Sequence, residues 1–180
     1  MVTITVGGLP GSGTTTACRK LREKLNLPYI YAGHIFRGMA DEAGMTLAEF
    51  GRYCEDHPEV DKELDRRQLE ILKHGDVIVE GRLSGWLAIE NDIPALTVWL
   101  WAPVDVRAGR IVEREGGELK EKREEMLERE FSEAKRYRTF YGMDLQDQER
   151  YDVVLETHTR TPDQVVDAIL VALEEKRDEL

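Results

Sequence analysis

A glycine-rich stretch near the N-terminus has the residue types and the spacing that could hold the phosphates of a nucleotide. It follows a run rich in β-branched residues, Val2 to Val6, and precedes a helical pattern. From Gly8 onward the spacing is G-x-x-x-x-G followed by Thr14 and Thr15, which is typical of a phosphate loop between a strand and a helix. Glycines let the backbone turn its N–H groups inward, and the helix N-terminus adds partial positive charge. The predicted phosphate-binding residues are Gly7, Gly8, Leu9, Pro10, Gly11, Ser12, Gly13, Thr14 and Thr15.

The loop departs from the general pattern at one position, where Thr14 stands in place of the usual lysine. That lysine ordinarily reaches the β- and γ-phosphates, so its loss keeps the backbone cradle and removes one positive charge. Thr15 stands where the hydroxyl of the loop would meet Mg²⁺. The alternative is a glycine-rich turn without a ligand. The flanking strand and helix and the register of Thr15 favour phosphate binding.

A second candidate group, Glu80 and Arg82, follows an apolar segment at residues 76–80 that is predicted to be a buried strand. The carboxyl end of a central parallel strand lies at the crevice where α/β sheets bind ligands. Beside a phosphate loop, Glu80 would hold Mg²⁺ or its waters, and Arg82 could grip a substrate phosphate through two hydrogen bonds. A plain charge at a strand end is the alternative for both residues.

Further arginines occur in separated segments of the chain. Arg37 lies in the first turns of a predicted helix, where a solvated surface charge is the alternative. Arg110 and Arg114 are four residues apart and therefore share one face of a helix predicted over residues 104–115. No acidic residue stands four positions before Arg110, so this pair is not obviously used in a local ion pair.

The segment from residue 119 to residue 141 is a predicted helix that is highly charged and contains few apolar residues. Such a helix is expected to have little anchorage in a core, which favours a mobile lid over a scaffold. Gly116 and Gly117 precede it as a predicted hinge, and Arg136 and Arg138 lie on it. A solvent-exposed helix held by its own salt bridges is the alternative.

Together these residues indicate phosphoryl transfer, because catalysis of that reaction consists of positioning and charge neutralisation. Arg37 and Arg82 could hold the phosphate of the acceptor. Four arginines could close over the donor and the transition state: Arg110, Arg114, Arg136 and Arg138. A closing lid would also exclude water, which otherwise competes with the acceptor.

The elements that must position these residues alternate along the chain. Strands are predicted at residues 2–6, 29–31, 76–80, 96–101 and 151–156, with helical patterns between them. This alternation predicts an α/β fold with a five-stranded parallel sheet and helices on both faces. Residues 38–73 contain more helices than a crossover between parallel strands needs, so they are predicted to form an insertion. Capping boxes at Thr46 and Thr161 mark the starts of two helices.

Length and charge exclude several classes of protein. The 180 residues correspond to one domain, and 25 basic against 36 acidic residues give a net charge of -11. This balance argues against general nucleic-acid binding and against attraction to an anionic membrane. No apolar run approaches the roughly 20 residues of a membrane span, and no signal peptide is visible. We therefore expect a cytoplasmic protein, in which Cys18 and Cys54 are free, buried thiols.

The chain resembles the nucleoside monophosphate kinases, most closely the archaeal-type cytidylate kinases. The resemblance is carried by GGLPGSGTTT at 7–16, YAGHIFR at 31–37, HPEVDKELDRRQ at 57–68, VIVEGRLSGW at 77–86, RIVER at 110–114 and AKRYRTFYG at 134–142. It implies a three-layer phosphate-loop kinase fold with sheet order 2-3-1-4-5. It also implies one kinase domain, residues 1–180, with a core (1–37, 74–114, 142–180), a monophosphate-binding insertion (38–73) and a lid (115–141).

The resemblance further implies that ATP and CMP (or dCMP) react, with Mg²⁺, to give ADP and CDP (or dCDP). Arg37 and Arg82 would bind the acceptor phosphate, and the four arginines named above would serve the lid. Thr15 and Glu80 would contact the metal. Candidates for reading the base are Asp61, Asp65, Arg66 and Arg67.

Two alternatives stay open from the sequence. The acceptor could instead be AMP or UMP, and the missing lysine could mark a nucleotide-binding module without kinase activity. We expect small nucleotides as the partners, with no nucleic acid and no membrane, and a monomer.

Overall fold

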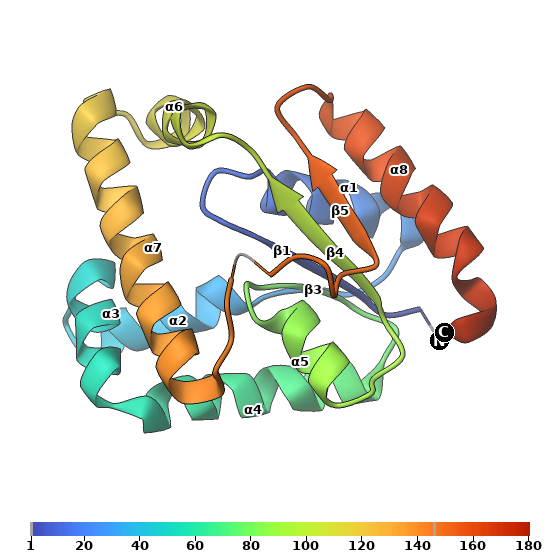
Figure 1. Cartoon of the computed structure of the whole chain (residues 1–180), viewed down its shortest axis with the longest axis horizontal. Helices are drawn as coiled ribbons and strands as arrows, with labels where there is room; N and C mark the ends of the chain where they lie inside the picture. The colour runs from blue at the N-terminus through green and yellow to red at the C-terminus, as the bar shows by residue number, and fades with distance from the viewer. Residues whose placement is uncertain (1, 146) are drawn as a thin grey trace.

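A five-stranded parallel sheet forms the centre of the protein (Figure 1), in a computed structural model that describes residues 2–145 and 147–180. The strand order is β2-β3-β1-β4-β5, which confirms the order that the family resemblance implies. The strands are β1 Ile4–Gly8, β2 Tyr29–Tyr31, β3 Ile78–Glu80, β4 Leu96–Trp101 and β5 Val153–Glu156. Because β1 is the middle strand, the loop after it opens at the centre of the carboxyl edge of the sheet.

Helices follow the strands along the chain. They are α1 Thr14–Leu25, α2 Ala32–Glu42, α3 Leu47–Asp56, α4 Pro58–His74, α5 Ser84–Glu90, α6 Val104–Glu115, α7 Leu119–Tyr141, α8 Pro162–Glu175 and the 3-10 helix η1 Arg177–Glu179. The sequence pattern does not indicate α5, because its seven residues make fewer than two turns over which an apolar stripe can repeat. In the described ranges, no helix has both the length and the apolar character needed to cross a membrane.

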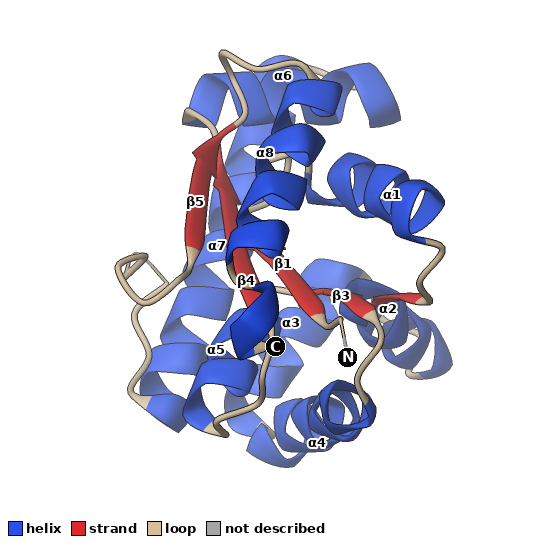
Figure 2. Cartoon of the chain, turned by 90° about the vertical axis from the view of Figure 1, so that its right-hand side faces the viewer, coloured by secondary structure: helices blue, strands red, loops and turns tan. Residues whose placement is uncertain are grey.

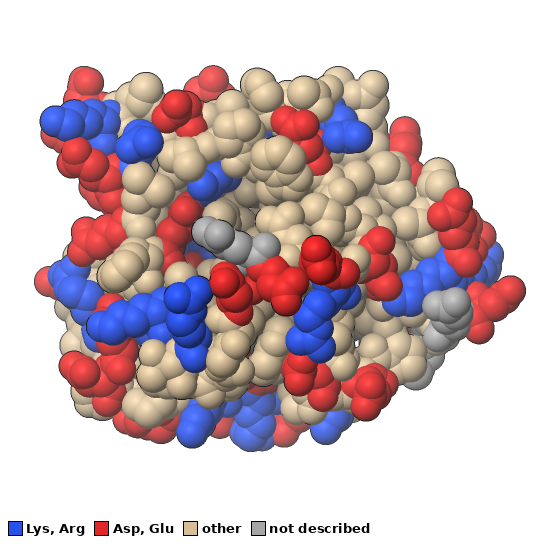
Figure 3. Space-filling model, viewed as in Figure 1, with Lys and Arg blue, Asp and Glu red and all other residues tan. Residues whose placement is uncertain are grey.

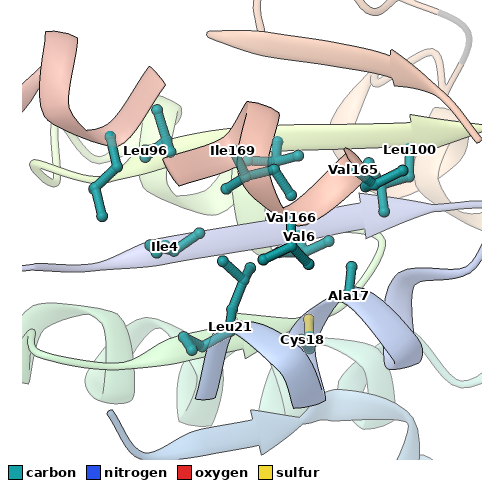
Figure 4. Packing of buried hydrophobic residues seen from close by; sticks show 13 residues of the cluster. Ile4, Val6, Ala17, Cys18, Leu21, Leu96, Leu100, Val165, Val166 and Ile169 are labelled. Atoms are coloured by element: carbon teal, nitrogen blue, oxygen red, sulfur yellow. The ribbon is translucent and has the colours of Figure 1, made fainter. Parts of the chain in front are cut away.

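The sheet is covered on both faces, as its apolar strands predict. α1 and α8 pack on one face, whereas α4 and α5 lie on the other (Figure 2). Figure 4 shows the first core cluster, which unites Val6 of β1, Leu21 of α1 and Ile169 of α8. The second cluster contains Val79 of β3 and Trp99 of β4. Burial on both faces fixes the strands, and through them the loops at their carboxyl ends.

Residues 38–73 have a small core of their own, where α2 and α3 pack against α4. Ala40, Phe50 and Cys54 are its buried members. The Thr46 side chain accepts from the Glu49 N–H, in the capping box that the sequence predicts at the start of α3. Cys54, like Cys18, is a free and buried thiol, as expected.

α7 is anchored far more firmly than its composition predicts. It runs along one end of the molecule from α6 toward α4 (Figure 1), and it packs against α3 and α6. Ser132, Glu133 and Arg136 are buried, and Tyr137 and Tyr141 pack on the second core cluster. The expectation of little anchorage was wrong because the anchoring groups are charged and aromatic. A count of apolar residues does not register buried ion pairs.

We expect Ile169→Ala to lower the free energy of unfolding by about 2–5 kcal/mol, because it opens a cavity between β1, α1 and α8. Val171→Ala on the same helix is the matched control, since Val171 is 59% exposed. Urea denaturation followed by circular dichroism measures both values. Equal stability of the two variants would contradict this account of the core.

Candidate active site

The predicted phosphate loop lies between β1 and α1. Glycine is required in it where the backbone has a left-handed conformation or where another part of the chain comes very close. Gly11 and Gly13 have φ angles of +80° and +90°, in the left-handed region. A Cβ atom on Gly11 would stand 2.6 Å from the carbonyl oxygen of Arg107. α1 begins with no side-chain cap and no acidic residue in its first turn, so its free N–H groups can meet an anion.

Two side chains behind the loop hold its carbonyl groups. Arg110 donates from Nη1 to the oxygen of Gly11 at 3.1 Å, and Thr157 donates to the oxygen of Ser12 at 2.8 Å. Arg110 also donates to the Thr157 hydroxyl at 2.9 Å, so the two supports are linked. Because the C=O and N–H of a trans peptide point in opposite directions, holding the Ser12 carbonyl turns the N–H of Gly13 to the other side. Beside this support lies a cavity of about 410 Å³ that Arg110, Thr157 and Gly13 line.

The carboxylate of Glu80 joins the loop to the end of β3. Thr14 and Thr15 donate their hydroxyls to the same oxygen, Oε1, at 2.6 and 2.7 Å, and Tyr29 donates to Oε2. Burial and the hydrogen bond to Glu80 raise the pKa of Tyr29, so this phenol stays a donor. The hydroxyl of Thr15 and the carboxylate are hard oxygen ligands in contact, a donor set that fits Mg²⁺. Thr14, in the place of the usual lysine, orients Glu80.

A second pocket lies where the end of β3 meets α4 and α7. Arg82 forms an ion pair with Glu133, and Arg136 forms one with Asp61 at 2.9 Å. Arg129 reaches Glu133 from the same side at 3.1 Å. These side chains nearly fill the pocket, and about 50 Å³ is left open. A ligand can therefore enter only if Glu133 and α7 give way.

Unsatisfied polar atoms concentrate in this pocket. Among the described residues, eight buried side-chain atoms make no hydrogen bond, and five of them belong to residues that line it. They are Asp61 Oδ2, Gln68 Oε1, Arg82 Nε, Glu133 Oε2 and Arg136 Nε. Four of these atoms face one another in the two ion pairs, Arg82 Nε with Glu133 Oε2 and Arg136 Nε with Asp61 Oδ2, so their charges are compensated. Gln68 Oε1 has neither a hydrogen bond nor an ion pair among the described residues, and buried polar atoms normally have such a partner.

The structure brings some of the predicted residues together and separates others. Arg82, Arg136, Asp61 and Asp65 line the second pocket. Arg37 and Arg114 instead line a cavity of about 470 Å³ that also touches Pro10 of the phosphate loop. Any ligand contact of Arg37 and Arg114 would therefore be made in the space between the phosphate loop and residues 38–73.

Three predicted residues lie outside these pockets. Arg66 and Arg67 are exposed on α4 and pair with Glu63. Arg138 is exposed and pairs with Asp144. Their positions give no support to base reading by Arg66 and Arg67, and Arg138 would need α7 to move.

Sequence reasoning missed Arg107, Gln68 and Glu133 as site residues. Arg107 is buried and donates to the oxygens of Ala102 and Pro10, at 3.0 and 3.1 Å, while it pairs with Glu130 of α7. It therefore connects the phosphate loop to α7. Its position three residues before Arg110, on the same helix face, was the one available signal.

The charged side chains at the second pocket are arranged differently from those on the protein surface. On the face in Figure 3, acidic and basic side chains are interspersed, whereas the buried Arg136 and the largely buried Arg82 line the same pocket. Burial raises the pKa of Asp65 to about 7, and the nearby Asp61 carboxylate adds to the increase. Tyr141 donates a hydrogen bond to Asp65, which acts in the opposite direction.

Comparison with known proteins places this geometry among kinases. Residues 3–159 match the model of the cytidylate kinase-like family. The cytidylate kinase of Methanocaldococcus jannaschii is 52% identical, over 86% of this chain and 87% of that protein. The cytidylate kinase of Methanopyrus kandleri is 47% identical, over 96% and 93% of the two chains. A gluconokinase structure from Sinorhizobium meliloti has a TM-score of 0.63 at 17% identity, over 99% and 94%, a likeness of fold.

The raised pKa of Asp65 predicts a pH-dependent stability. Because the folded-state pKa is about 7 and the unfolded value about 4, Asp65 stabilises the fold at low pH and this contribution is lost as the pH rises through 7. Relative to wild type, Asp65→Asn should gain a few kcal/mol in the free energy of unfolding between pH 5 and pH 8. Urea denaturation at both pH values measures this difference. Parallel pH profiles of the two proteins would show that Asp65 titrates normally.

Proposed function

The chain belongs to the cytidylate kinase-like family, and we infer that it transfers the γ-phosphate of ATP to CMP or dCMP, giving ADP and CDP or dCDP. It is an ATP-dependent phosphotransferase. The observation that carries the inference is the meeting of two sites at the end of β3. Glu80 contacts the phosphate loop, and Arg82, two residues later, lies in the pocket that holds the two ion pairs and the unpaired amide oxygen of Gln68.

We propose that the loop residues 7–15 bind the phosphates of ATP through the backbone cradle and the N-terminus of α1. Thr15 and Glu80 would hold Mg²⁺, which, when bound, would neutralise part of the negative charge of the phosphates. Arg110 and Arg114 already line the cavities beside the loop, so they are our first candidates for stabilising the transition state. Arg136 and Arg138 would join them only after a movement of α7.

The acceptor is proposed to occupy the second pocket. Arg82 would grip the phosphate of CMP in place of the Glu133 carboxylate, and Arg37 would approach it from the cavity beside the loop. Asp61 and Asp65 lie at the α4 wall of the pocket, where the predicted contact with the base is possible. Residues 38–73 would then act as the monophosphate-binding part, and residues 115–141 as the lid.

The remaining proposals concern the context of the enzyme. We propose that the enzyme is a monomer. Light scattering during size-exclusion chromatography tests it. The net charge of -11 speaks against nucleic acid as a partner. The cytoplasm is the proposed location because ATP and CMP are intracellular metabolites.

A kinetic assay of ADP release with CMP, dCMP, UMP and AMP tests the proposed function. We expect CMP or dCMP to have the highest kcat/KM. Preference for AMP or UMP would reassign the acceptor. ATP binding without ADP release from any acceptor would instead show a nucleotide-binding module.

Arg82→Ala should lower kcat/KM for CMP by roughly 10- to 150-fold, because a charge-assisted contact of about 1.5–3 kcal/mol with the acceptor phosphate is lost. The KM for ATP should change little, since the loop that binds ATP is left intact. Arg123→Ala is the matched control, because Arg123 is exposed on α7 and pairs with Asp105 of α6. Wild-type kinetics with CMP in the Arg82 variant would remove Arg82 from the acceptor site.

A further inference from the structure

Gln68 is a buried residue of α4 whose amide oxygen has no partner. Its side chain is 2% exposed and lines the second pocket, and Oε1 makes no hydrogen bond among the described residues. A Cβ atom on Gly81 would lie 3.0 Å from this oxygen, so the oxygen packs closely against the glycine at the wall of the pocket. An unpaired buried amide oxygen costs free energy until a donor reaches it. The residue therefore needs a ligand that carries an N–H or O–H group.

The orientation of the Gln68 amide is set by a short chain of hydrogen bonds. Gln68 donates from Nε2 to Oδ1 of Asp65 at 3.3 Å, and Tyr141 donates to Oδ2 of the same carboxylate. An ionised carboxylate only accepts hydrogen bonds, so it can face the NH₂ group of an amide but not its oxygen. With both oxygens of Asp65 accepting, the NH₂ of Gln68 is held against Asp65 and Oε1 is directed away from it.

We propose that Gln68 reads the exocyclic amine of cytosine through Oε1, and that Asp65 and Tyr141 are positioning residues that prevent its amide from turning over. The proposal rests on the proposed function and specifies how the acceptor base is chosen. Cytosine presents the N4 amine as a donor, which satisfies the unpaired oxygen. Uracil presents the O4 oxygen at the same place, so two acceptors would face each other and Oε1 would stay unpaired.

The size of the discrimination follows from this arrangement. A site built to hydrogen-bond one substrate group rejects an analogue without that group by about 10⁴–10⁵ when the site is fully desolvated. Here the pocket must open to admit the base, so we expect a smaller preference, at least about 10² in kcat/KM for CMP over UMP. An amide free to turn could serve both bases, because it can present either its oxygen or its NH₂ group. The fixed orientation, rather than the presence of an amide, would therefore give the selectivity.

The test compares kcat/KM for CMP and UMP, and the equilibrium binding of both by calorimetry, in the full chain at pH 8.5. At that pH Asp65 is ionised, since burial raises its pKa only to about 7. Asp65→Asn leaves a side chain that both donates and accepts, so Gln68 can turn over and the CMP/UMP ratio should fall at least tenfold. Gln68→Met removes the reading atom and should also reduce the ratio at least tenfold. Asp41→Asn, at an exposed acid of α2, is the control and should leave the ratio unchanged.

A merely structural role for Asp65 or Gln68 would lower the rates with both nucleotides equally and keep their ratio. An unchanged ratio in both variants, with an active wild-type enzyme, would overturn the role of Gln68 alone. A wild-type enzyme that phosphorylates neither CMP nor UMP would overturn the proposed function itself. A wild-type enzyme that uses both nucleotides equally would also overturn the role of Gln68, while the phosphotransferase assignment would stand.

Discussion

Burying positive charge is the constraint on which this structure depends. A site for two phosphate-bearing substrates needs guanidinium groups in a water-poor pocket, and a buried charge without a partner is strongly destabilising. Three arginines are accordingly paired with a carboxylate: the largely buried Arg82 with Glu133, and the buried Arg107 and Arg136 with Glu130 and Asp61. With a net charge of -11, the chain has acidic residues to spare for this purpose. The positive charges of the site are thus neutralised by the protein's own carboxylates.

α7 owes its place to the same constraint. Glu130 and Glu133 lie about one turn apart on this helix, and they pair with arginines on the two sides of the site. Arg107 belongs to the side of the phosphate loop, to which it donates at Pro10, whereas Arg82 belongs to the end of β3. A phosphate that reached Arg82 would take the place of the Glu133 carboxylate, so Arg82 would stay paired with an anion. Binding would then leave no arginine charge unpaired, and the contact between α7 and Arg82 would be lost.

The sequence was sufficient where structure depends on local patterns. β-Branched strands, the glycine spacing of the loop and the Thr46 capping box lie within short windows, and the structure has them within about two residues. The sequence also predicted that Thr15 and Glu80 lie near one Mg²⁺ site, because the loop after β1 and the end of β3 share the carboxyl edge of the sheet, and the two side chains are in contact. The pairing of Glu133 with Arg82 spans about 50 residues, and many other acids on α7 were equally plausible. Such a contact depends on which face of a helix the tertiary fold turns inward, which composition does not reveal.

The charges of the second pocket also restrict how this chain can vary. Arg129 and Arg82 share Glu133, so exchanging Glu133 alone leaves the largely buried Arg82 without its carboxylate partner. Effects of substitutions in such a network do not add, and a change that is harmful alone becomes tolerable beside a second one. Two sequences that both keep the fold are therefore expected to differ at two of these positions at once rather than at one. Across descendants of this protein the positions should be inherited as a set, and single replacements should survive on the solvent face of α7 instead.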